Sequence, residues 1–380
     1  MQNFTFKNPT EILFGKGTIA KIGSRIPADK PVLLLYGGGS IKRNGVYDQV
    51  RAALRNHPAL HEFGGVEANP LFETCMQAVE LVKGQKIGFI LAVGGGSVLD
   101  AAKFIAAAVN YDGDPWGILQ AHGQGLKSAL PIGTVLTLPA TGSEANGNSV
   151  ISRRETQEKL AFGSPLVFPV FSVLDPETTF TLPRKQVRNG IVDSFMHVME
   201  QYMTYPSQAP LQDRFAEGVV QTLIETGPVT LDNPQDYESR AAFMWSATLA
   251  LNMLIGAGVP QDWSTHGIGH ELTAFYGLDH AETLAIILPG VWRHQFARKK
   301  EKLEQYGRRV WGVDTAEQAI AKTEEFLKSL GMPVRLADYK IDVKEAAGKI
   351  RARFAERGTK LGEHGDIGPE QVAEIVLGRA

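Results

Sequence analysis

The feature that most constrains the fold is a set of short apolar runs in the first half of the chain. The four runs are Val32–Tyr36, Ile87–Val93, Ile132–Leu138 and Phe171–Leu174, each bounded by Gly or Pro. Continuous apolar runs of this length suit strands that are buried on both faces, as in a parallel α/β sheet. Between them, the pattern predicts helices over Asp48–Arg55 and Thr74–Val82.

The texture of the sequence changes after about Pro183, where the periodicity becomes helical and no convincing strand run follows. The clearest predicted helices are Leu211–Ile224, Ser239–Leu254, Leu284–Phe296 and Glu317–Leu330, and apolar helical stretches are also predicted over residues 191–199 and 255–270. A chain of 380 residues is long for one compact core. We therefore expect an α/β domain over residues 1–182 and an all-α domain over residues 183–380.

Composition excludes several classes of protein. The net charge of −2 offers no basic field for nucleic acid or an anionic membrane. No apolar run approaches the roughly 20 residues of a membrane span, and the N-terminus lacks the pattern of a signal peptide. The only cysteine, Cys75, excludes an intrachain disulfide and a metal site with two cysteine ligands. We expect a cytoplasmic protein that binds neither nucleic acid nor membrane.

A glycine-rich turn follows the second apolar run. Gly94, Gly95, Gly96 and Ser97 lead into a helical stretch, where Ser97 is a candidate N-cap and Asp100 stands at the capping-box position. Glycines let the backbone approach a pyrophosphate, and the helix N-terminus supplies free N–H groups. The alternative is a tight strand–helix connection without a ligand.

Two further loops are candidates for nucleotide contacts. After the Val32–Tyr36 run, the turn contains Gly37, Gly38, Gly39 and Ser40 and then Lys42 and Arg43, but no carboxylate. An acid at this place binds the ribose 2′-OH of NAD, whereas glycine N–H groups and cations suit a 2′-phosphate. The third loop follows the Ile132–Leu138 run. Thr137, Leu138 and Thr141 are its candidates for contacts to the nucleotide, through a hydroxyl or a backbone N–H. Either loop could instead be a solvated turn or a helix cap.

Histidines and carboxylates are spaced for one helix face in the second half. Asp193 and His197 lie four residues apart with Glu200 three further on, His266 and His270 repeat the spacing, and His280 follows ten residues later. Carboxylate and imidazole ligands without thiolate suit Zn²⁺ or Fe²⁺ better than Mg²⁺ or Ca²⁺. The alternative is a set of structural or surface histidines.

Taken together, these residues resemble the iron-containing alcohol dehydrogenases, most closely the bacterial NADPH-dependent aldehyde reductase and butanol dehydrogenase branch. The resemblance rests on Gly94–Asp100 with Lys103, Thr137–Glu144, Leu174–Pro176, Pro183, Gly190, Asp193, His197 and Glu200, and His266–Leu272 with His280. It implies a Rossmann-like dinucleotide-binding domain, a helical metal-binding domain like that of dehydroquinate synthase, and a homodimer. It also implies reversible reduction of small aldehydes to alcohols with NADP(H) and one Zn or Fe ion.

The resemblance assigns roles residue by residue. Asp193, His197, His266 and His280 match the metal ligands, and His270 matches a further active-site histidine that is usually not a ligand. We expect His270 to take part in catalysis, and a proton relay through it is a hypothesis. Lys159 matches a residue that reaches the cofactor ribose, and Gly37, Gly38 and Ser40 stand where NAD-preferring members tend to carry an aspartate. Asn148 and Trp263 are candidate pocket walls. Two residues depart from the family pattern. Arg188 stands where a small or aliphatic residue is usual, and Ser194 stands where Ala, Thr or an aliphatic residue is usual.

Other functions remain open at this stage. A dehydroquinate synthase-like lyase would need more cations near the metal segments, where only Arg214 and Arg240 lie between Gly190 and His280. A polyol dehydrogenase such as glycerol dehydrogenase is a second alternative. Its metal site has three protein ligands, whereas this sequence offers four. A metal-sensing or metal-binding module that is not an enzyme is the third alternative.

Overall fold

The computed structural model describes residues 1–57 and 59–380. They divide into two compact units. The α/β unit comprises Lys7–Pro183 and Pro234–Thr248, and the helical unit comprises Met1–Phe6, Arg184–Asn233 and Leu249–Ala380. Residues 234–248, which the sequence analysis placed in the second domain, thus belong to the α/β unit.

The α/β unit is built on one parallel sheet of six strands in the order β1-β8-β5-β4-β2-β3. The strands are β1 (Glu11–Phe14), β2 (Val32–Tyr36), β3 (Leu60–Phe63), β4 (Phe89–Gly95), β5 (Ile132–Leu138) and β8 (Phe171–Leu174). A separate antiparallel hairpin pairs β6 (Asn148–Arg153) with β7 (Glu158–Gly163). The four apolar runs are therefore strands as predicted, and the parallel α/β class is confirmed.

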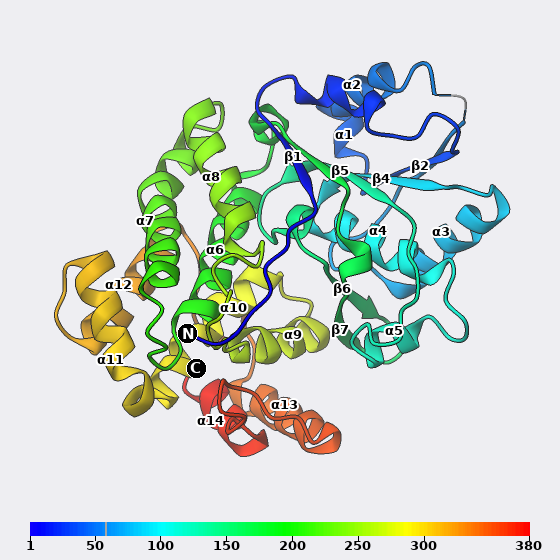
Figure 1. Ribbon diagram of the computed structural model, residues 1–380. Helices are drawn as coiled ribbons and strands as arrows, with labels where there is room; N and C mark the ends of the chain where they lie inside the picture. Colours follow the sequence, from blue (N-terminus) through cyan, green and yellow to red (C-terminus); the bar gives the residue numbers. More distant parts are fainter. Residues whose placement is uncertain (58) are drawn as a thin grey trace. The chain divides into compact units, whose positions relative to one another are not determined.

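Helices cover both faces of this sheet because its side chains alternate between two apolar clusters. Leu33, Leu35, Ile90 and Ala92 face a core formed with α3 (Phe72–Gly84), α4 (Gly96–Ala108) and α5 (Trp116–Gln120). Leu34 and Leu91 face the opposite core, formed with a 3₁₀ segment (Thr18–Ser24), α1 (Ser40–Arg43) and α2 (Val46–Ala53). Figure 1 shows α1 and α2 on one side of the sheet and α3 and α4 on the other.

The strands with less apolar content were not predicted from the sequence. β1 and β3 are the two edge strands, and the residues of β3 are all partly exposed. The β6–β7 hairpin carries polar residues along both strands. Strands with one solvated side lack the continuous apolar run that identified the central four.

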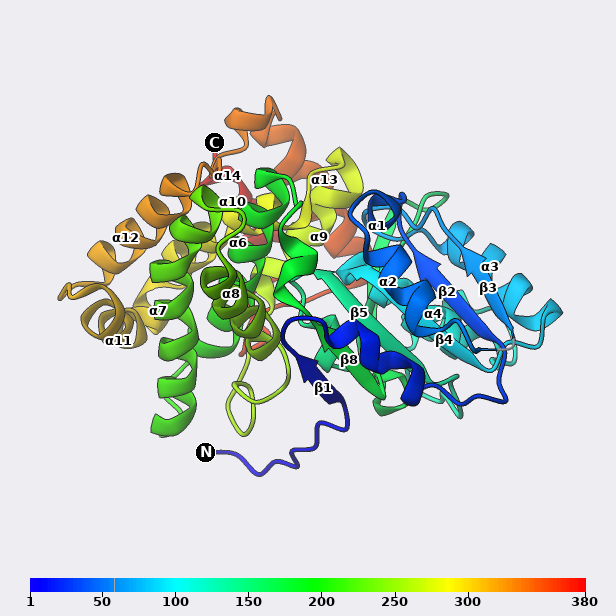
Figure 2. The same cartoon turned by 90° about the horizontal axis from the view of Figure 1, so that it is seen from above.

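Beyond β8, the described residues form helices and no further strand of the sheets. They are α6 (Arg184–Tyr202), α7 (Pro210–Asp232), α8 (Tyr237–Ala250), α9 (Ser264–Tyr276), α10 (His280–His294), α11 (Phe296–Tyr306), α12 (Ala316–Ser329), α13 (Val343–Arg357) and α14 (Pro369–Leu377). In Figure 2, α6 and α7 run side by side through the helical unit. The predicted helix over residues 255–270 is wrong in its first half, because α9 begins only at Ser264, after the Asp262 carboxylate that accepts its first N–H.

No helix among the described residues has the length and apolar character needed to span a bilayer.

Candidate active site

Three loops of the α/β unit meet at one edge of its sheet. β2, β4 and β5 are parallel neighbours, so the turns after Tyr36, Gly95 and Leu138 leave the same edge. The chain continues from β2 to β3 on one side and then to β4 on the other, which makes the space between β2 and β4 the switch point of the sheet. Ligands of open α/β sheets bind outside the carboxyl ends of strands at such a point. Both predicted glycine turns lie there.

The glycines between β4 and α4 permit close packing against the β5 loop. A Cβ added to Gly95 would stand 2.9 Å from Leu138 Cβ, and one added to Gly96 would stand 2.5 Å from Thr141 Oγ1. The α4 helix begins at Gly96, and no side chain caps it among the described residues. Its first N–H groups are therefore suited to an anionic ligand.

The predicted cap of this helix is wrong, since Gly95 is the N-cap in place of Ser97, and Asp100 makes other bonds. The Asp100 carboxylate accepts hydrogen bonds from Ser143 Oγ at 2.6 Å and Val150 N at 3.0 Å. Lys103, which is fully buried, donates to Ser143 Oγ, Asn146 Oδ1 and Asn148 O. Burial lowers the pKa of Lys103 to about 8 and raises that of Asp100. This network fixes the segment from Ser143 to Val150.

The first glycine turn meets a carboxylate that the sequence analysis missed. Lys42 Nζ lies 3.6 Å from Glu62 Oε2 and over the rings of Tyr36 and Tyr47. Glu62 comes from β3, the next strand, and also accepts from Tyr47 Oη at 2.6 Å. Lys42 therefore already has an anionic partner, whereas Arg43 is exposed. Only pairing β2 with β3 brings Glu62 here, so no local signal indicates it.

The other predicted nucleotide contacts lie on the β5 and β7 strands or their loops. Thr137 is buried, and Thr141 Oγ1 accepts from Ser143 N at 3.2 Å. Lys159 is buried on β7 and donates to Asn69 Oδ1 at 2.9 Å. Asn148, a candidate pocket wall, is exposed at the start of β6.

The helical unit assembles a candidate metal centre from three helices. Asp193 on α6, His266 on α9 and His280 at the start of α10 each offer one ligand atom, all within 4.8 Å of one another. Asp193 and His266 are buried, and His280 is partly exposed. His197 lies beside this group: its Nε2 is 3.8 Å from Asp193 Oδ1, and its ring stacks on His266 with centroids 4.9 Å apart. The i, i+4 spacing thus places His197 beside Asp193, although His197 is not one of the three converging residues.

The donor set of this centre fits a borderline divalent cation. One carboxylate and imidazoles without thiolate are ligands that Zn²⁺ and Fe²⁺ accept. Asp193 is buried, and its Oδ1 lies 3.8 Å from the Nε2 atoms of both His197 and His280. The residues present therefore fit the metal that the sequence pattern predicts.

Two other predicted residues border the centre. His270 has its ring 5.3 Å from that of His280 and 6.4 Å from that of His266, and it is not one of the three converging ligands. The indole of Trp263 lies edge-on to His266 with centroids 5.0 Å apart.

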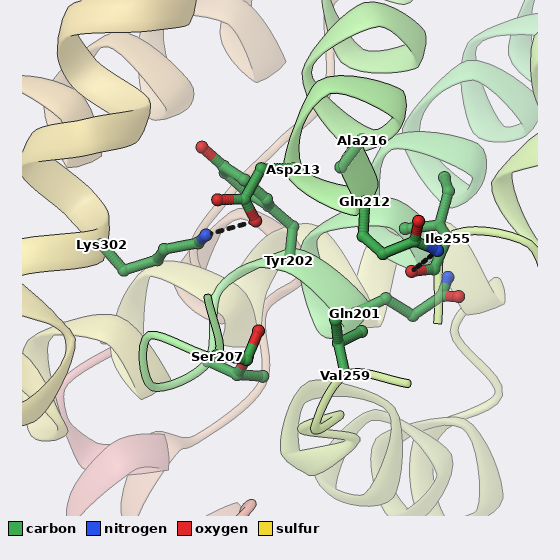
Figure 3. Close-up of a pocket in the computed structure, with 10 residues that line it drawn as sticks. Gln201, Tyr202, Ser207, Gln212, Asp213, Ala216, Ile255, Val259 and Lys302 are labelled. Atoms are coloured by element: carbon green, nitrogen blue, oxygen red, sulfur yellow. Dashed lines mark hydrogen bonds and ion pairs between the residues drawn. The ribbon is translucent and has the colours of Figure 1, made fainter. Parts of the chain in front are cut away.

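A separate polar cavity in the helical unit is too small for a substrate. Figure 3 shows it between the Lys302–Asp213 ion pair and Gln201. Its volume of about 10 Å³ has room for at most one water molecule. We therefore exclude it as a substrate site.

Comparison with known proteins identifies the class. A model described as iron-containing alcohol dehydrogenase matches residues 9–176, and the C-terminal model of the Fe-containing alcohol dehydrogenase family matches residues 188–376. The chain belongs to the iron-containing alcohol dehydrogenase family and is an oxidoreductase, which confirms the resemblance and disfavours the lyase and the non-enzyme alternatives.

Individual relatives are similar along nearly their whole length. The chain is 55% identical over 376 residues to the NADPH-dependent aldehyde reductase YqhD of Escherichia coli K12, with 97% of each chain covered. It is 45% identical over 386 residues to the probable NADH-dependent butanol dehydrogenase 1 of Bacillus subtilis, with 99% of each covered. The crystal structure of E. coli YqhD matches with a TM-score of 0.98 at 53% identity, covering 100% of this chain and 99% of that chain.

Proposed function

We propose that this protein reduces aldehydes to primary alcohols, reversibly, by metal-assisted hydride transfer from NADPH. The observation that carries the proposal is the convergence of Asp193, His266 and His280 in a member of the iron-containing alcohol dehydrogenase family. The name of the E. coli relative supports the aldehyde and NADPH assignments. We further propose that the enzyme is a cytoplasmic homodimer.

The proposed metal ligands are Asp193, His197, His266 and His280, with Zn or Fe as the ion. When bound, the ion would supply Lewis-acid polarisation of the substrate oxygen. The chain's own part is to hold the ligands on three helices, with all of them buried except the partly exposed His280. We assign His270 to proton transfer, because it is an imidazole next to His280. His197 and His270 both lie outside the three converging ligands, and we keep His197 as a ligand because its Nε2 lies 3.8 Å from Asp193 Oδ1.

The proposed cofactor contacts all lie in the α/β unit, at or near the edge where β2, β4 and β5 end. They are Gly37, Gly38, Ser40, Gly94, Gly95, Gly96, Ser97, Asp100, Thr137, Leu138, Thr141 and Lys159. Asp100 would act mainly by fixing the segment from Ser143 to Val150, since both of its oxygens are occupied within the protein. We propose residues 1–182, completed by residues 234–248, as the dinucleotide-binding domain, and the rest of residues 183–380 as the metal-binding domain.

Steady-state oxidation of NADPH with butyraldehyde tests the activity, with metal analysis of the same preparation. Prolonged chelation is expected to abolish turnover, and added Zn²⁺ or Fe²⁺ to restore part of it. The His266→Ala variant should lose most bound metal and nearly all activity. Full turnover in metal-free protein would overturn the proposed mechanism.

A further inference from the structure

The carboxylate of Glu200 connects the end of α6 to the start of α9 beside the candidate metal centre. Its Oε1 accepts a hydrogen bond from the backbone N–H of His266 at 2.9 Å and lies 3.0 Å from Nδ1 of the same ring. Glu200 and His266 are both buried. One oxygen atom therefore fixes both the place of His266 in the helix and the rotation of its ring.

This contact also selects which ring nitrogen carries the proton. Oε1 of Glu200 already accepts the backbone N–H of His266, so the same oxygen also acts as the acceptor toward the ring, and Nδ1 is the donor. The Nε2 atom is then the nitrogen that can bind a cation. Such outer partners orient metal-binding histidines and raise their basicity. We infer that Glu200 is a positioning residue that prepares His266 for the metal, an inference that rests on the proposed metal site.

The charge around Glu200 supports this role. Among the described residues, no Lys or Arg nitrogen lies within 4.0 Å of its carboxylate, and its ion pair is with His266. By contrast, the buried Glu217 pairs with Arg214 and Arg309. Lys299, the other cation whose charge acts on Glu200, is paired with Asp262 and Glu363. His266 is therefore the direct partner of the Glu200 carboxylate, as a positioning role toward that ring requires.

A buried lysine holds this arrangement in place. Lys299 on α11 donates to Met203 O at 2.7 Å, just beyond α6, and to Glu363 Oε1 at 2.9 Å. Its Nζ also lies 2.9 Å from Asp262 Oδ2. Asp262 in turn donates its backbone N–H to Glu200 O at 2.8 Å. The end of α6 and the start of α9 are thus joined on both sides of the Glu200–His266 contact.

Metal affinity tests the inference on the folded full-length protein. Zinc affinity, measured by competition with a chromogenic chelator, should fall about 10- to 100-fold in Glu200→Ala, the usual loss for an outer-shell partner. Glu200→Gln should retain most of the affinity, because its amide oxygen still accepts both hydrogen bonds. Glu217→Gln is the matched control, since it alters a buried glutamate whose partners are arginines and Tyr202. It should bind zinc like the wild type.

Two outcomes would overturn the role of Glu200. One is wild-type zinc affinity in a folded Glu200→Ala protein, and the other is an equal loss in the Ala and Gln variants. Failure of the wild type to bind either Zn²⁺ or Fe²⁺ would instead overturn the proposed metal site and, with it, the proposed function.

A second measurement covers the case in which Glu200→Ala does not fold. Ring ¹⁵N–¹H spectra of the zinc-loaded wild type, assigned with His266→Gln, should show the His266 proton on Nδ1. A proton on Nε2 would overturn the inference. This readout does not depend on turnover or on any variant at Glu200.

Discussion

At Gly38 the turn between β2 and α1 has room for a side chain. A Cβ added there meets no atom within 4 Å, and the residue is not among those with positive φ. An aspartate can therefore be introduced without strain. It would bind the ribose 2′-OH of NADH and repel the 2′-phosphate of NADPH.

Gly38 offers a test of the cofactor preference, since one relative is named for NADPH and the other for NADH. Losing a charge-assisted hydrogen bond costs about 1.5–3 kcal/mol, so we expect the wild type to prefer NADPH at least about tenfold in kcat/KM. Gly38→Asp should shrink or reverse that ratio. Steady-state kinetics with both cofactors and one aldehyde measure it.

The uncharged variant Gly38→Ala is the control and should keep the wild-type preference. Equal efficiency of NADH and NADPH in the wild type would show that this turn does not read the phosphate. The engagement of Lys42 by Glu62 makes Arg43 and the backbone N–H groups the main candidates for that contact.

A substitution at His270 tests whether metal binding and proton transfer depend on different residues. Since it lies outside the three converging ligands, His270→Ala should retain the metal while kcat falls by about 10²–10⁴, the usual range for a lost proton-transfer partner. Metal content and kcat measured on the same protein decide the outcome. His294→Ala, at the far end of α10, should leave both unchanged. Metal loss as large as in His266→Ala would make His270 a ligand.

At the scale of elements, the first turn of α10 is tied to α6. The α10 helix begins at His280, directly after Asp279, which forms a capping box with Glu282. Arg188 on α6 donates to Glu282 Oε1 at 3.2 Å and to Gly331 O at 2.7 Å. Asn189 donates to Asp279 Oδ2 at 3.1 Å. These bonds hold the start of α10, and with it His280, in a fixed position relative to Asp193 on α6.

Arg188→Met should therefore loosen His280. We expect metal affinity to fall by up to about tenfold, the low end for outer-shell changes, because the contact to the ligand is indirect. A chelator competition assay measures the affinity. Arg184→Met is the control, as that arginine is exposed on the same helix and bonds to Leu231 O and Asp232. Equal affinity in Arg188→Met and the wild type would mean that α10 holds its position without the bonds of Arg188.

At the scale of the whole molecule, each of the two units is built from more than one stretch of the chain. Most of α8 belongs to the α/β unit: Met244 packs in the same apolar cluster as α3 and α4, and Thr248 Oγ1 donates to Glu144 Oε1 at 2.5 Å. A cut at Pro183 would remove this helix from the sheet-bearing unit. The α/β unit therefore includes a segment that follows α7 in the sequence.

A buried ion cluster near the C-terminus should make stability depend on acid pH. Burial by itself would raise the pKa of Glu324, but hydrogen bonds from Arg293 and the charge of Arg379 lower it to about 2. A depressed carboxyl pKa stabilises the folded state above the unfolded pKa. That contribution, at most about 3 kcal/mol by linkage because solvent screens the half-exposed Arg293, is lost as the pH falls from about 5 to about 2.

Glu324→Gln should be less stable than the wild type at pH 7, and the difference should narrow as the pH falls. Urea unfolding at pH 7, 5 and 3 measures the difference, since other carboxyl groups affect both proteins alike. Glu325→Gln is the control, because its pair with Lys322 is exposed and contributes little. A difference that stays constant from pH 7 to pH 3 would contradict the prediction.

The sequence by itself determined the features that lie within a few residues of one another. The central strands β2, β4, β5 and β8 follow from apolar runs, and most helices follow from their periodicity. The i, i+4 spacing of Asp193 and His197 and of His266 and His270 indicated a metal site, because one turn of helix brings such residues together. The glycine turns indicated a nucleotide site, because a strand, a glycine turn and a helix N-terminus that follow one another in the sequence are enough to form a phosphate site.

Only the tertiary structure decided the contacts between distant segments. The pairing of β2 with both β3 and β4 creates the switch point and brings Glu62 to Lys42. The approach of α9 to α6 gives Glu200 its bond to His266, 66 residues away, and the β5 loop leaves Asp100 bound to Ser143 in place of the helix cap. Such contacts depend on how whole elements pack, and local periodicity carries no record of that packing.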